Sequence, residues 1–318
     1  FCIRATPYTG GLGAFATKAI PAGTEVFRAQ EPFVKVVYGP YKKEVCAYCF
    51  SYDRGRKMKQ VERSVGGKEQ RGIAWFCSET CRTSWKASLK AQDLETLSRV
   101  SAGVSKVQKG RITGNKILSP ADIEAAWQAA ERAPVPKSLA LLHEEDDQDT
   151  VYFLLDGILA RARNPSGWNA FLSLNPSLQP YDTPGTLESH LRIFHYLRFT
   201  LPEALRPFCS PETILALVTR DHGNSFGIFE DELGRDGEML GYGTWTEASF
   251  FNHSCGANLT KRRSGRFYVF TAKCDIQPGE ELCINYIEDA VAEPVDVRRA
   301  RLQAGWGFVC RCARCTEE

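Results

Sequence analysis

The chain has 318 residues, 43% of them hydrophobic and 25% charged, and its formal net charge is +2. This length can bury a full core and is usual for about two domains, and the composition is that of an ordinary globular protein. A net charge near zero excludes the strong basic field of many nucleic-acid-binding proteins, and no apolar run approaches the roughly 18 residues of a membrane span. We therefore expect no direct nucleic-acid binding and no membrane insertion. The sequence begins at Phe1, so a cleaved targeting segment upstream stays open.

Short strands are predicted for residues 1–38. The segments FCIRATPY (1–8) and TEVFRAQEPFVKVVY (24–38) are rich in β-branched and aromatic residues, and Pro21-Ala22-Gly23 marks a turn between them. Residues 40–82 then carry closely spaced cysteines around a polar, basic middle. This composition is typical of a small insert held by metal rather than by a hydrophobic core.

Helical signals dominate residues 83–222. Ser119-Pro120, followed by Asp122, forms a helix-capping sequence, and Ser210-Pro211-Glu212 is a second start signal. The segments VYFLLDGILARAR (151–163) and TLESHLRIFHYLRF (186–199) place apolar residues at the spacing of a helical face. We expect four or five helices in this region.

Strand signals return after residue 223, in SFGIFE (225–230), GRFYVFTAKCDI (265–276) and ELCINYI (281–287), and residues 296–315 begin as a short basic helix. Strands at both ends of the chain thus flank a helical middle. We predict an α+β fold in which the two terminal regions pair in short mixed β-sheets across the helical insertion.

Eight of the twelve cysteines fall into two groups. A secreted disulfide framework is one explanation, but it belongs to short chains that cannot build a core. Paired cysteines with two or three residues between them suit thiolate ligation of zinc in a reducing compartment, so we expect a structural zinc ion in each group. The insert cysteine group is Cys46, Cys49, Cys77 and Cys81. The C-terminal cysteine group is Cys255, Cys310, Cys312 and Cys315.

The C-terminal group needs a ligand from a distant part of the chain. Cys310, Cys312 and Cys315 supply three thiolates within six residues, and structural zinc requires four. Cys255 is the natural fourth ligand, although a buried free cysteine is the simpler explanation for that residue alone. Zinc at this place would hold the C-terminus over the pocket lined by Asn252 and His253. For the insert group, no nearby His or Glu suggests catalysis, and Trp75 and Phe76 are expected to pack over the metal.

A glycine-rich segment near the N-terminus has two explanations. Gly11-Leu12-Gly13-Ala14-Phe15-Ala16 fits the dinucleotide-binding pattern G-x-G-x-x-A, with Glu31 about twenty residues further on. That pattern requires a helix after the glycines, but Pro21 and Gly23 arrive too soon, so we reject a nicotinamide-binding unit. The glycines then serve either a close approach of the backbone to a ligand or a tight turn, and the pattern alone leaves both open.

Taken together, these segments resemble the SET-domain methyltransferases, and more closely the branch that carries a MYND-type zinc insert. The segments that carry the resemblance are GGLGAFATKAIPAGTEVF (10–27), NSFGIF (224–229), FFNHSCGANL (250–259), IQPGEELCINYI (276–287) and CRCARC (310–315). They occur in the family's order and span nearly the whole chain. The resemblance implies a SET fold with a zinc insert, a large helical insertion and a zinc-bound C-terminal tail.

The resemblance also implies a binding site for S-adenosylmethionine and an active-site tyrosine. Tyr286 matches the catalytic tyrosine and would also border the cofactor, and Trp306 would line the lysine channel. The other expected cofactor-binding residues are Gly11, Leu12, Gly13, Asn224, Ser249, Phe250, Asn252, His253 and Phe308.

The chain departs from the family's pattern in three places. A MYND insert normally holds two zinc ions, but the cysteines here suffice for one, which puts peptide recognition by the insert in doubt. Ala257 stands where the family often has proline, and Leu12 stands between the glycines where a polar residue is usual.

The expected domains are the N-terminal part of the SET domain (1–40), the MYND-like zinc insert (41–90), the helical insertion (91–222), the C-terminal SET core (223–290) and the zinc tail (291–318). The implied activity is methylation of a lysine in a protein or peptide, with histones as one candidate substrate, by a monomer in the nucleus, the cytoplasm or both. The alternative is an inactive scaffold, organised by zinc, that mediates protein interactions.

Overall fold

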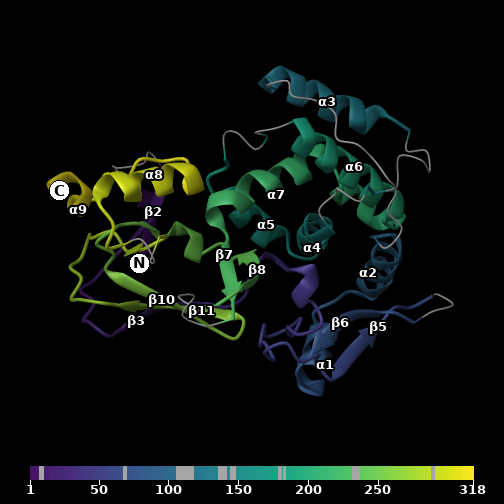
Figure 1. Ribbon diagram of the computed structural model, residues 1–318, viewed down its shortest axis with the longest axis horizontal. Coiled ribbons are helices and arrows are strands. Elements are labelled where there is room, and N and C mark those ends of the chain that lie inside the picture. The colour runs from purple at the N-terminus through teal and green to yellow at the C-terminus, as the bar shows by residue number, and fades with distance from the viewer. Residues whose placement is uncertain are drawn as a thin grey trace. The chain divides into compact units, whose positions relative to one another are not determined.

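The computed structural model describes residues 1–6, 11–66, 70–104, 118–134, 142–143, 148–177, 181, 184–230, 237–287 and 291–318 (Figure 1). The chain forms two compact units. The first unit combines Phe1–Phe33, Ala170–Ser177 and Arg220–Glu318, and the second combines Val34–Asn169 and Leu178–Thr219. Each unit therefore joins segments that are far apart in the sequence.

The first unit contains small sheets and two C-terminal helices. Its strands are β1 (Cys2–Ala5), β2 (Leu12–Phe15), β3 (Glu25–Ala29), β7 (Phe226–Phe229), β8 (Met239–Thr244), β9 (Asn252–His253), β10 (Leu259–Ser264), β11 (Phe267–Ala272) and β12 (Cys283–Ile284). Its helices are the 3-10 helix η4 (Ala248–Phe250), α8 (Val295–Trp306) and α9 (Ala313–Glu317). Strands β1 and β2 form an antiparallel pair, as do β7 and β8, whereas β9 and β12 run parallel.

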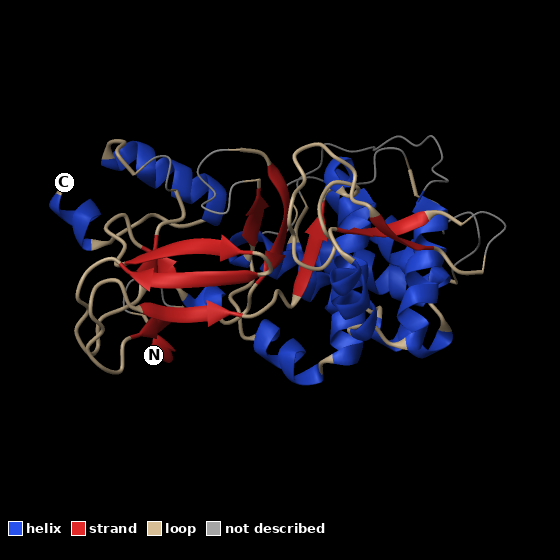
Figure 2. Cartoon of the chain, turned by 90° about the horizontal axis from the view of Figure 1, so that it is seen from below, coloured by secondary structure: helices blue, strands red, loops and turns tan. Residues whose placement is uncertain are grey.

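The predicted pairing between the two ends of the chain is confirmed. Strand β3 pairs antiparallel with β11, with Phe27 opposite Phe270, and β10 completes this three-stranded sheet (Figure 2). Isolated bridges also join Phe15 to Glu281 and Ile20 to Ile276. The N-terminal segment thus lies against residues that follow it by about 250 positions, which brings the glycine segment close to the C-terminal motifs.

Aromatic side chains fill the core of this unit. The rings of Phe251 and Phe270 are 4.7 Å apart, and both side chains are fully buried. Phe27 on β3 packs on both, at 6.1 Å and 6.4 Å. Burial of each such ring contributes about 1.5–3 kcal/mol, so the cross-chain strand pairing is held by packing as well as by hydrogen bonds.

The second unit is mainly helical. Its strands are β4 (Val34–Val37), β5 (Gln60–Arg63) and β6 (Gly72–Phe76). Its helices are η1 (Gly39–Tyr41), α1 (Glu79–Ala87), α2 (Ala91–Val104), α3 (Pro120–Arg132), α4 (Gln148–Arg163), α6 (Pro184–Thr200) and η3 (Glu203–Phe208). Helices α5 (Pro165–Leu172) and α7 (Pro211–Asn224) begin in this unit and end in the first.

The predicted helix starts are confirmed, but the predicted number is too low. Ser119 and Asp122 form a capping box at the start of α3, and the Ser210 hydroxyl accepts a hydrogen bond from the Thr213 amide at the start of α7. Between residues 83 and 222 the described segments contain six α-helices, α2 to α7, rather than four or five. The prediction missed elements such as α5, which is a short helix that follows directly on α4. It also missed β8 and the strongly charged β10.

A small apolar cluster stabilises the insert that carries the insert cysteine group. Strands β5 and β6 form a hairpin, and α1 follows it, beginning at Ser78, whose hydroxyl accepts from the Cys81 amide. Cys46 packs with Met58 and with Trp75 and Phe76, the two aromatic residues that we expected beside this cysteine group. In the described part of the chain, no helix is long and apolar enough to cross a membrane.

Candidate active site

Gly13 on β2 lies where the backbone passes close to two polar side chains. A β-carbon at this position would be 2.3 Å from Glu281 Oε1 and 2.7 Å from Asn252 Nδ2. Only glycine fits this approach without a shift of those side chains. The glycine segment therefore forms a strand at a close contact, and not the turn into a helix that a dinucleotide site requires.

Glu281 connects the glycine segment to the Asn252 motif. Its side chain accepts hydrogen bonds from Asn252 Nδ2 at 2.8 Å and from the Thr6 hydroxyl at 3.1 Å. Asn252 Nδ2 also donates to the carbonyl oxygen of Leu12 at 3.1 Å. The side chain of Asn258 donates to the Glu281 carbonyl at 2.9 Å and accepts from the Cys283 amide at 2.8 Å. This network fixes β2 and both C-terminal motifs relative to one another.

His253 has protein partners at both ring nitrogens. Its Nδ1 accepts a hydrogen bond from the Tyr286 amide at 3.0 Å, so the proton of the neutral ring belongs on Nε2, which lies 3.3 Å from Cys255 Sγ. Burial, with nearby Lys261 and Arg298, lowers the pKa of His253 to about 4. The ring is therefore neutral at physiological pH, and it links the tyrosine segment to the C-terminal cysteine group.

The Tyr286 hydroxyl points at the backbone of the Asn252 motif. The hydroxyl donates to the Phe251 carbonyl at 3.1 Å, which orients the oxygen and leaves its lone pairs available to accept a further hydrogen bond. Burial raises the pKa of Tyr286 above its ordinary value, so the phenol stays protonated at neutral pH. Such a group orients a partner better than it removes a proton.

Two aromatic residues from the C-terminal segment border Tyr286. The Trp306 ring lies 5.4 Å from the Tyr286 ring, and the Phe308 ring lies 6.5 Å from it in an edge-on arrangement. Gly307, between them, ends α8 in the left-handed conformation with φ of 74°. This glycine allows the chain to reverse sharply after Trp306 and return Phe308 to the same ring.

Three further predicted residues, Asn224, Ser249 and Phe250, lie at or beside η4. The Ser249 hydroxyl donates to the Asn224 carbonyl at 2.8 Å, and Asn224 Nδ2 donates to the carbonyls of Asn175 and Arg220, each at 2.9 Å. The Asn224 amide group is thus engaged inside the first unit. Helix η4, which carries Ser249 and the half-buried Phe250, contacts β2.

The C-terminal cysteine group has the geometry of a four-thiolate metal site. Its four sulfur atoms lie within 4.8 Å of one another, and the Cys255 and Cys315 sulfurs are 3.5 Å apart. Tetrahedral zinc with bonds near 2.3 Å requires sulfur atoms about 3.8 Å apart, whereas a disulfide requires about 2.05 Å. All four cysteines are free. The arrangement therefore fits zinc, and it joins Cys255 to the tail as predicted.

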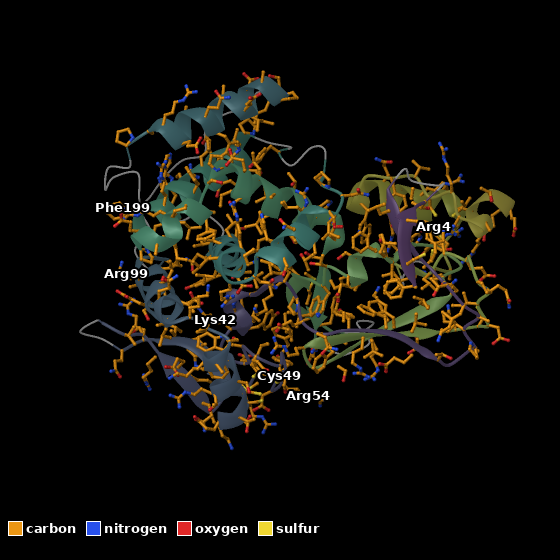
Figure 3. All side chains as sticks on the ribbon, turned by 180° about the vertical axis from the view of Figure 1, so that it is seen from behind. Arg4, Lys42, Cys49, Arg54, Arg99 and Phe199 are labelled. Atoms are coloured by element: carbon orange, nitrogen blue, oxygen red, sulfur yellow. The ribbon has the colours of Figure 1, made fainter. Side chains whose placement is uncertain are left out.

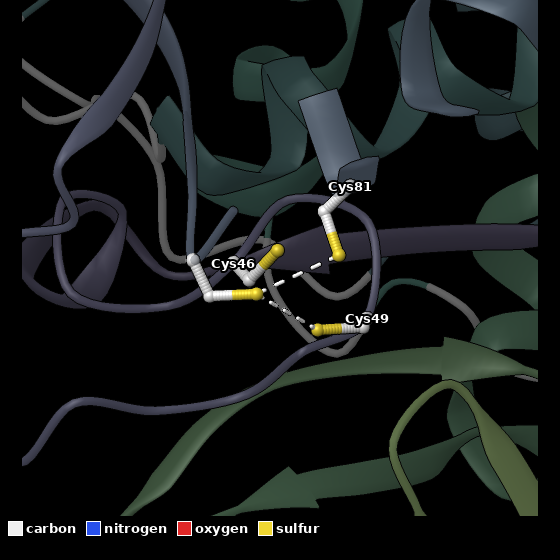
Figure 4. Close-up of side chains that lie close together, drawn as sticks. Cys46, Cys49 and Cys81 are labelled. Atoms are coloured by element: carbon white, nitrogen blue, oxygen red, sulfur yellow. Dashed lines mark hydrogen bonds between the residues drawn. The ribbon is translucent and has the colours of Figure 1, made fainter. Parts of the chain in front are cut away.

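The insert cysteine group has the same geometry (Figure 4). Cys77 Sγ lies 3.7 Å from Cys49 Sγ and 3.5 Å from Cys81 Sγ. A hydrogen bond with Cys49 lowers the pKa of Cys46, which favours its thiolate form. In the described ranges these two groups are the only clusters of three or more potential metal ligands.

Comparison with known proteins identifies the family. A model of the SET domain matches residues 11–287, which is most of the chain. The chain belongs to the SET domain family. Every residue described above as part of the site, apart from Thr6 and the C-terminal segment after residue 287, lies within the matched range.

Several curated proteins are similar to this SET domain chain. It is 28% identical to the potential protein lysine methyltransferase SET6 of Saccharomyces cerevisiae, over 100% of this chain and 95% of that protein. It is 28% identical to the histone-lysine N-methyltransferase ASHR2 of Arabidopsis thaliana, over 54% and 46% respectively. It is 29% identical to the N-lysine methyltransferase SMYD2 of Homo sapiens, over 34% of this chain and 24% of the relative. The last two similarities thus cover less than half of either relative.

The SET domain brings most of the predicted site residues together. Gly13, Asn252 and His253 form one network with Tyr286, and Trp306 and Phe308 border the same tyrosine. Asn224 and Ser249 form a separate contact beside η4. Sequence reasoning missed Glu281, although the acidic pair in IQPGEELCINYI was the signal that could have found it. It also missed Arg298, whose sequence context on α8 carries no such signal.

A surface hollow of about 560 Å³ also lies in this unit of the SET domain, and its wall includes Asn258 and Glu281. Arg4, which projects from β1 (Figure 3), is part of the same wall. Its guanidinium lies 3.9 Å from the centre of the Phe15 ring and donates a hydrogen bond to the Gly279 carbonyl. None of the predicted cofactor-binding residues is part of this wall. We therefore place the candidate active site at Tyr286 and not in this hollow.

Proposed function

We propose that this SET domain protein transfers a methyl group from S-adenosylmethionine to the side-chain amine of a lysine in a protein substrate. The observation that carries the proposal is the position of the Tyr286 hydroxyl. It is protonated, it is fixed by the Phe251 carbonyl, and it is bordered by Trp306 and Phe308. The names of the similar proteins, which are lysine methyltransferases, support the same activity.

The residues around Asn252 fit a bound S-adenosylmethionine. Asn252 uses its amide hydrogens for Leu12 and Glu281, and no described residue donates to its Oδ1, which leaves an acceptor for an ammonium group. Leu12 is 38% exposed and Phe308 is half-buried, so both offer apolar surface to an aromatic ring. We propose that these residues hold the cofactor together with Gly11, Gly13, Asn224, Ser249, Phe250 and His253, with Tyr286 at its reactive end.

The bound cofactor would supply a methyl group made electrophilic by its positive sulfur. The task of the protein is then to align a lysine amine with that group. Correct alignment of two reacting groups can lower the barrier by about 7–11 kcal/mol, so a positioned hydroxyl has a large effect without acting as a base. Tyr286 suits this task because its oxygen can accept a hydrogen bond from the amine.

The amine must lose a proton before it can attack. A free lysine side chain has a pKa of about 10.4, and an apolar environment lowers that value because it disfavours the charged form. Tyr286, Trp306 and Phe308 provide such an environment. Deprotonation to solvent is then sufficient, and no buried general base is needed.

The two cysteine groups are proposed as structural zinc sites. In the C-terminal group, zinc would bind Cys255, Cys310, Cys312 and Cys315 and so fix the chain that carries Phe308. In the insert group it would hold the hairpin β5–β6 to α1. Neither set leaves an open position for a catalytic water.

The substrate class follows from the relatives by analogy. One of them is named a histone-lysine methyltransferase and another an N-lysine methyltransferase, so a histone or another nuclear or cytoplasmic protein is the substrate that we propose. The enzyme would act in those compartments, where thiols remain reduced and zinc–thiolate sites persist.

Labelling of a whole-cell extract tests the proposal. The protein is incubated with the extract and S-adenosylmethionine that carries a radioactive methyl group, and the labelled residue is identified by mass spectrometry. We expect label on lysine side chains of one or a few proteins. A protein that binds S-adenosylmethionine but labels nothing would be a scaffold. Label on another residue type would exclude the assigned reaction.

A further inference from the structure

Arg298 on α8 is a fully buried arginine, with 0% of its side chain exposed. A buried guanidinium costs much free energy unless charged or polar partners surround it. Its partners come from the C-terminal segment. It donates through Nη1 to the Glu293 carbonyl and through Nη2 to Glu318 Oε2 at 2.8 Å. These two contacts leave part of the guanidinium to face the C-terminal cysteine group.

That remaining face meets two of the proposed zinc ligands. Arg298 Nη2 donates to Cys315 Sγ at 3.5 Å, and its guanidinium also interacts with the Cys255 thiol. Cys255 and Cys315 are themselves buried and lie 3.5 Å apart. The cation therefore contacts the pair of sulfurs that joins the body of the SET domain to the tail.

The charge of a filled site explains why a cation is placed there. Four thiolates and one Zn²⁺ carry a net charge of −2, and in a buried position that charge is poorly solvated. A guanidinium that donates hydrogen bonds to the thiolates offsets part of it and makes the sulfurs less ready to take a proton or leave the metal.

In the part of the chain that the structure describes, no cation donates a hydrogen bond to the insert cysteine group. Within the described segments, the hydrogen-bond partners of its sulfurs are other cysteines, the Ser78 hydroxyl, which accepts from Cys77, and backbone amides, and none of these partners carries a positive charge. Cys77 is exposed to solvent, whereas three of the four ligands in the C-terminal group are buried. The two sites therefore have the same ligands but different surroundings.

We infer that Arg298 is a positioning residue for the C-terminal zinc and makes it the slowly exchanging metal, while the insert zinc is the labile one, open to chelators and to thiol-reactive electrophiles. This inference rests on the zinc binding proposed above. A role of Arg298 in packing alone would affect the fold of α8 but would not distinguish the two metals.

Zinc release to a coloured chelator tests the inference on the whole chain. The wild-type protein should release two zinc ions in two phases, and Cys77→Ser should abolish the fast phase while the slow phase remains. Arg298→Met should accelerate the slow phase by about 10- to 100-fold, the usual effect of removing a partner of a metal ligand. Glu318→Gln, which removes the carboxylate partner but keeps the cation at the sulfurs, should change that phase less than Arg298→Met.

The controls separate the possible outcomes. If the wild-type protein holds fewer than two zinc ions, the proposed zinc sites themselves are wrong. If it holds two but releases them at one rate, or if Arg298→Met leaves the slow phase unchanged, the role of Arg298 is refuted. If circular dichroism shows that Arg298→Met does not fold, the zinc release of Arg298→Lys tests the inference instead. This variant keeps the charge without the forked donors, so its slow phase should be severalfold faster than wild type, and an unchanged rate would refute the inference.

Discussion

The hydroxyl of Tyr286 donates a hydrogen bond to the carbonyl oxygen of Phe251, 3.1 Å away. Phe251 is fully buried in the aromatic core and directly precedes Asn252, so the core itself sets the direction of the hydroxyl. The Tyr286 amide is fixed as well, because it donates to His253. Both ends of the tyrosine are therefore anchored to the motif that we propose as the cofactor site.

Gly13→Ala should disrupt the cofactor site. The new β-carbon would lie 2.3 Å from Glu281 Oε1 and 2.7 Å from Asn252 Nδ2, so the hydrogen bond between these side chains must shift. We expect a loss of about 1–3 kcal/mol in the free energy of unfolding, as for other overpacked sites, and weaker binding of S-adenosylmethionine. Chemical denaturation and calorimetric titration measure the two effects.

Gly256→Ala is the matched control for that substitution. Gly256 belongs to the same motif, but a β-carbon there would meet no atom within 4 Å. Both stability and cofactor binding should stay close to wild type. Equal effects of the two substitutions would show that the close approach at Gly13 has no special role.

Glu281→Gln should weaken the network that joins the three motifs. The amide keeps one acceptor oxygen for Asn252 and turns its NH₂ group toward the Thr6 hydroxyl, which must change from donor to acceptor. Both hydrogen bonds to the carboxylate are then replaced by weaker neutral ones, at a cost of about 1–2 kcal/mol, and we expect cofactor affinity to fall with it. The neighbouring exposed Glu280, changed to Gln, is the control and should behave like wild type in thermal unfolding and in titration.

Cys255→Ser should remove one zinc ion. The C-terminal group would retain three thiolates, too few for a closed structural site, so the metal content should fall from two ions per chain to one. The tail that carries Phe308 should then become sensitive to limited proteolysis. Cys274→Ser, at an exposed cysteine outside both groups, should leave the metal content unchanged. An unaltered zinc content in Cys255→Ser would exclude Cys255 as a ligand.

The stability of the fold should decrease at high pH partly through Tyr286. An ordinary tyrosine has a pKa of about 10, and burial raises the pKa of Tyr286 above that value. Tyr286 therefore ionises at a lower pH in the unfolded chain than in the folded protein. Its contribution to stability is complete below about pH 10 and is lost as the pH rises from there toward the folded pKa. Denaturation curves at about pH 8 and about pH 11 should show a smaller pH-dependent loss in Tyr286→Phe than in wild type; an identical loss would mean that Tyr286 is not buried in solution.

The fold was largely predictable because its strongest signals are local. The pair Ser119 and Asp122 is enough to predict the start of a helix, and the spacing of Cys310, Cys312 and Cys315 is enough to predict a metal site. Strand-like composition at both ends of the chain was enough to predict that the two terminal regions pair, but not that β3 pairs with β11. Helix α5 was missed because it is short and follows directly on α4.

The contacts that organise the site were less predictable, because they depend on side-chain directions that a sequence pattern does not contain. Glu281 was visible only as one of two adjacent acidic residues, and which of them turns inward depends on the bridge between Phe15 and Glu281. Arg298 lies in a basic stretch of α8 that suggests an exposed face. For His253, the motif indicated a cofactor contact, and the structure adds that both ring nitrogens already bind the protein.

The rate of methyl transfer by Tyr286→Phe, measured together with its binding of S-adenosylmethionine, tests the central claim most directly. The substitution removes only the hydroxyl and leaves the ring beside Trp306 and Phe308. We expect normal folding, cofactor affinity close to wild type, and a transfer rate lower by roughly two orders of magnitude, as for a misaligned reacting group. A variant that binds the cofactor and still methylates lysine at the wild-type rate would contradict the assignment of Tyr286.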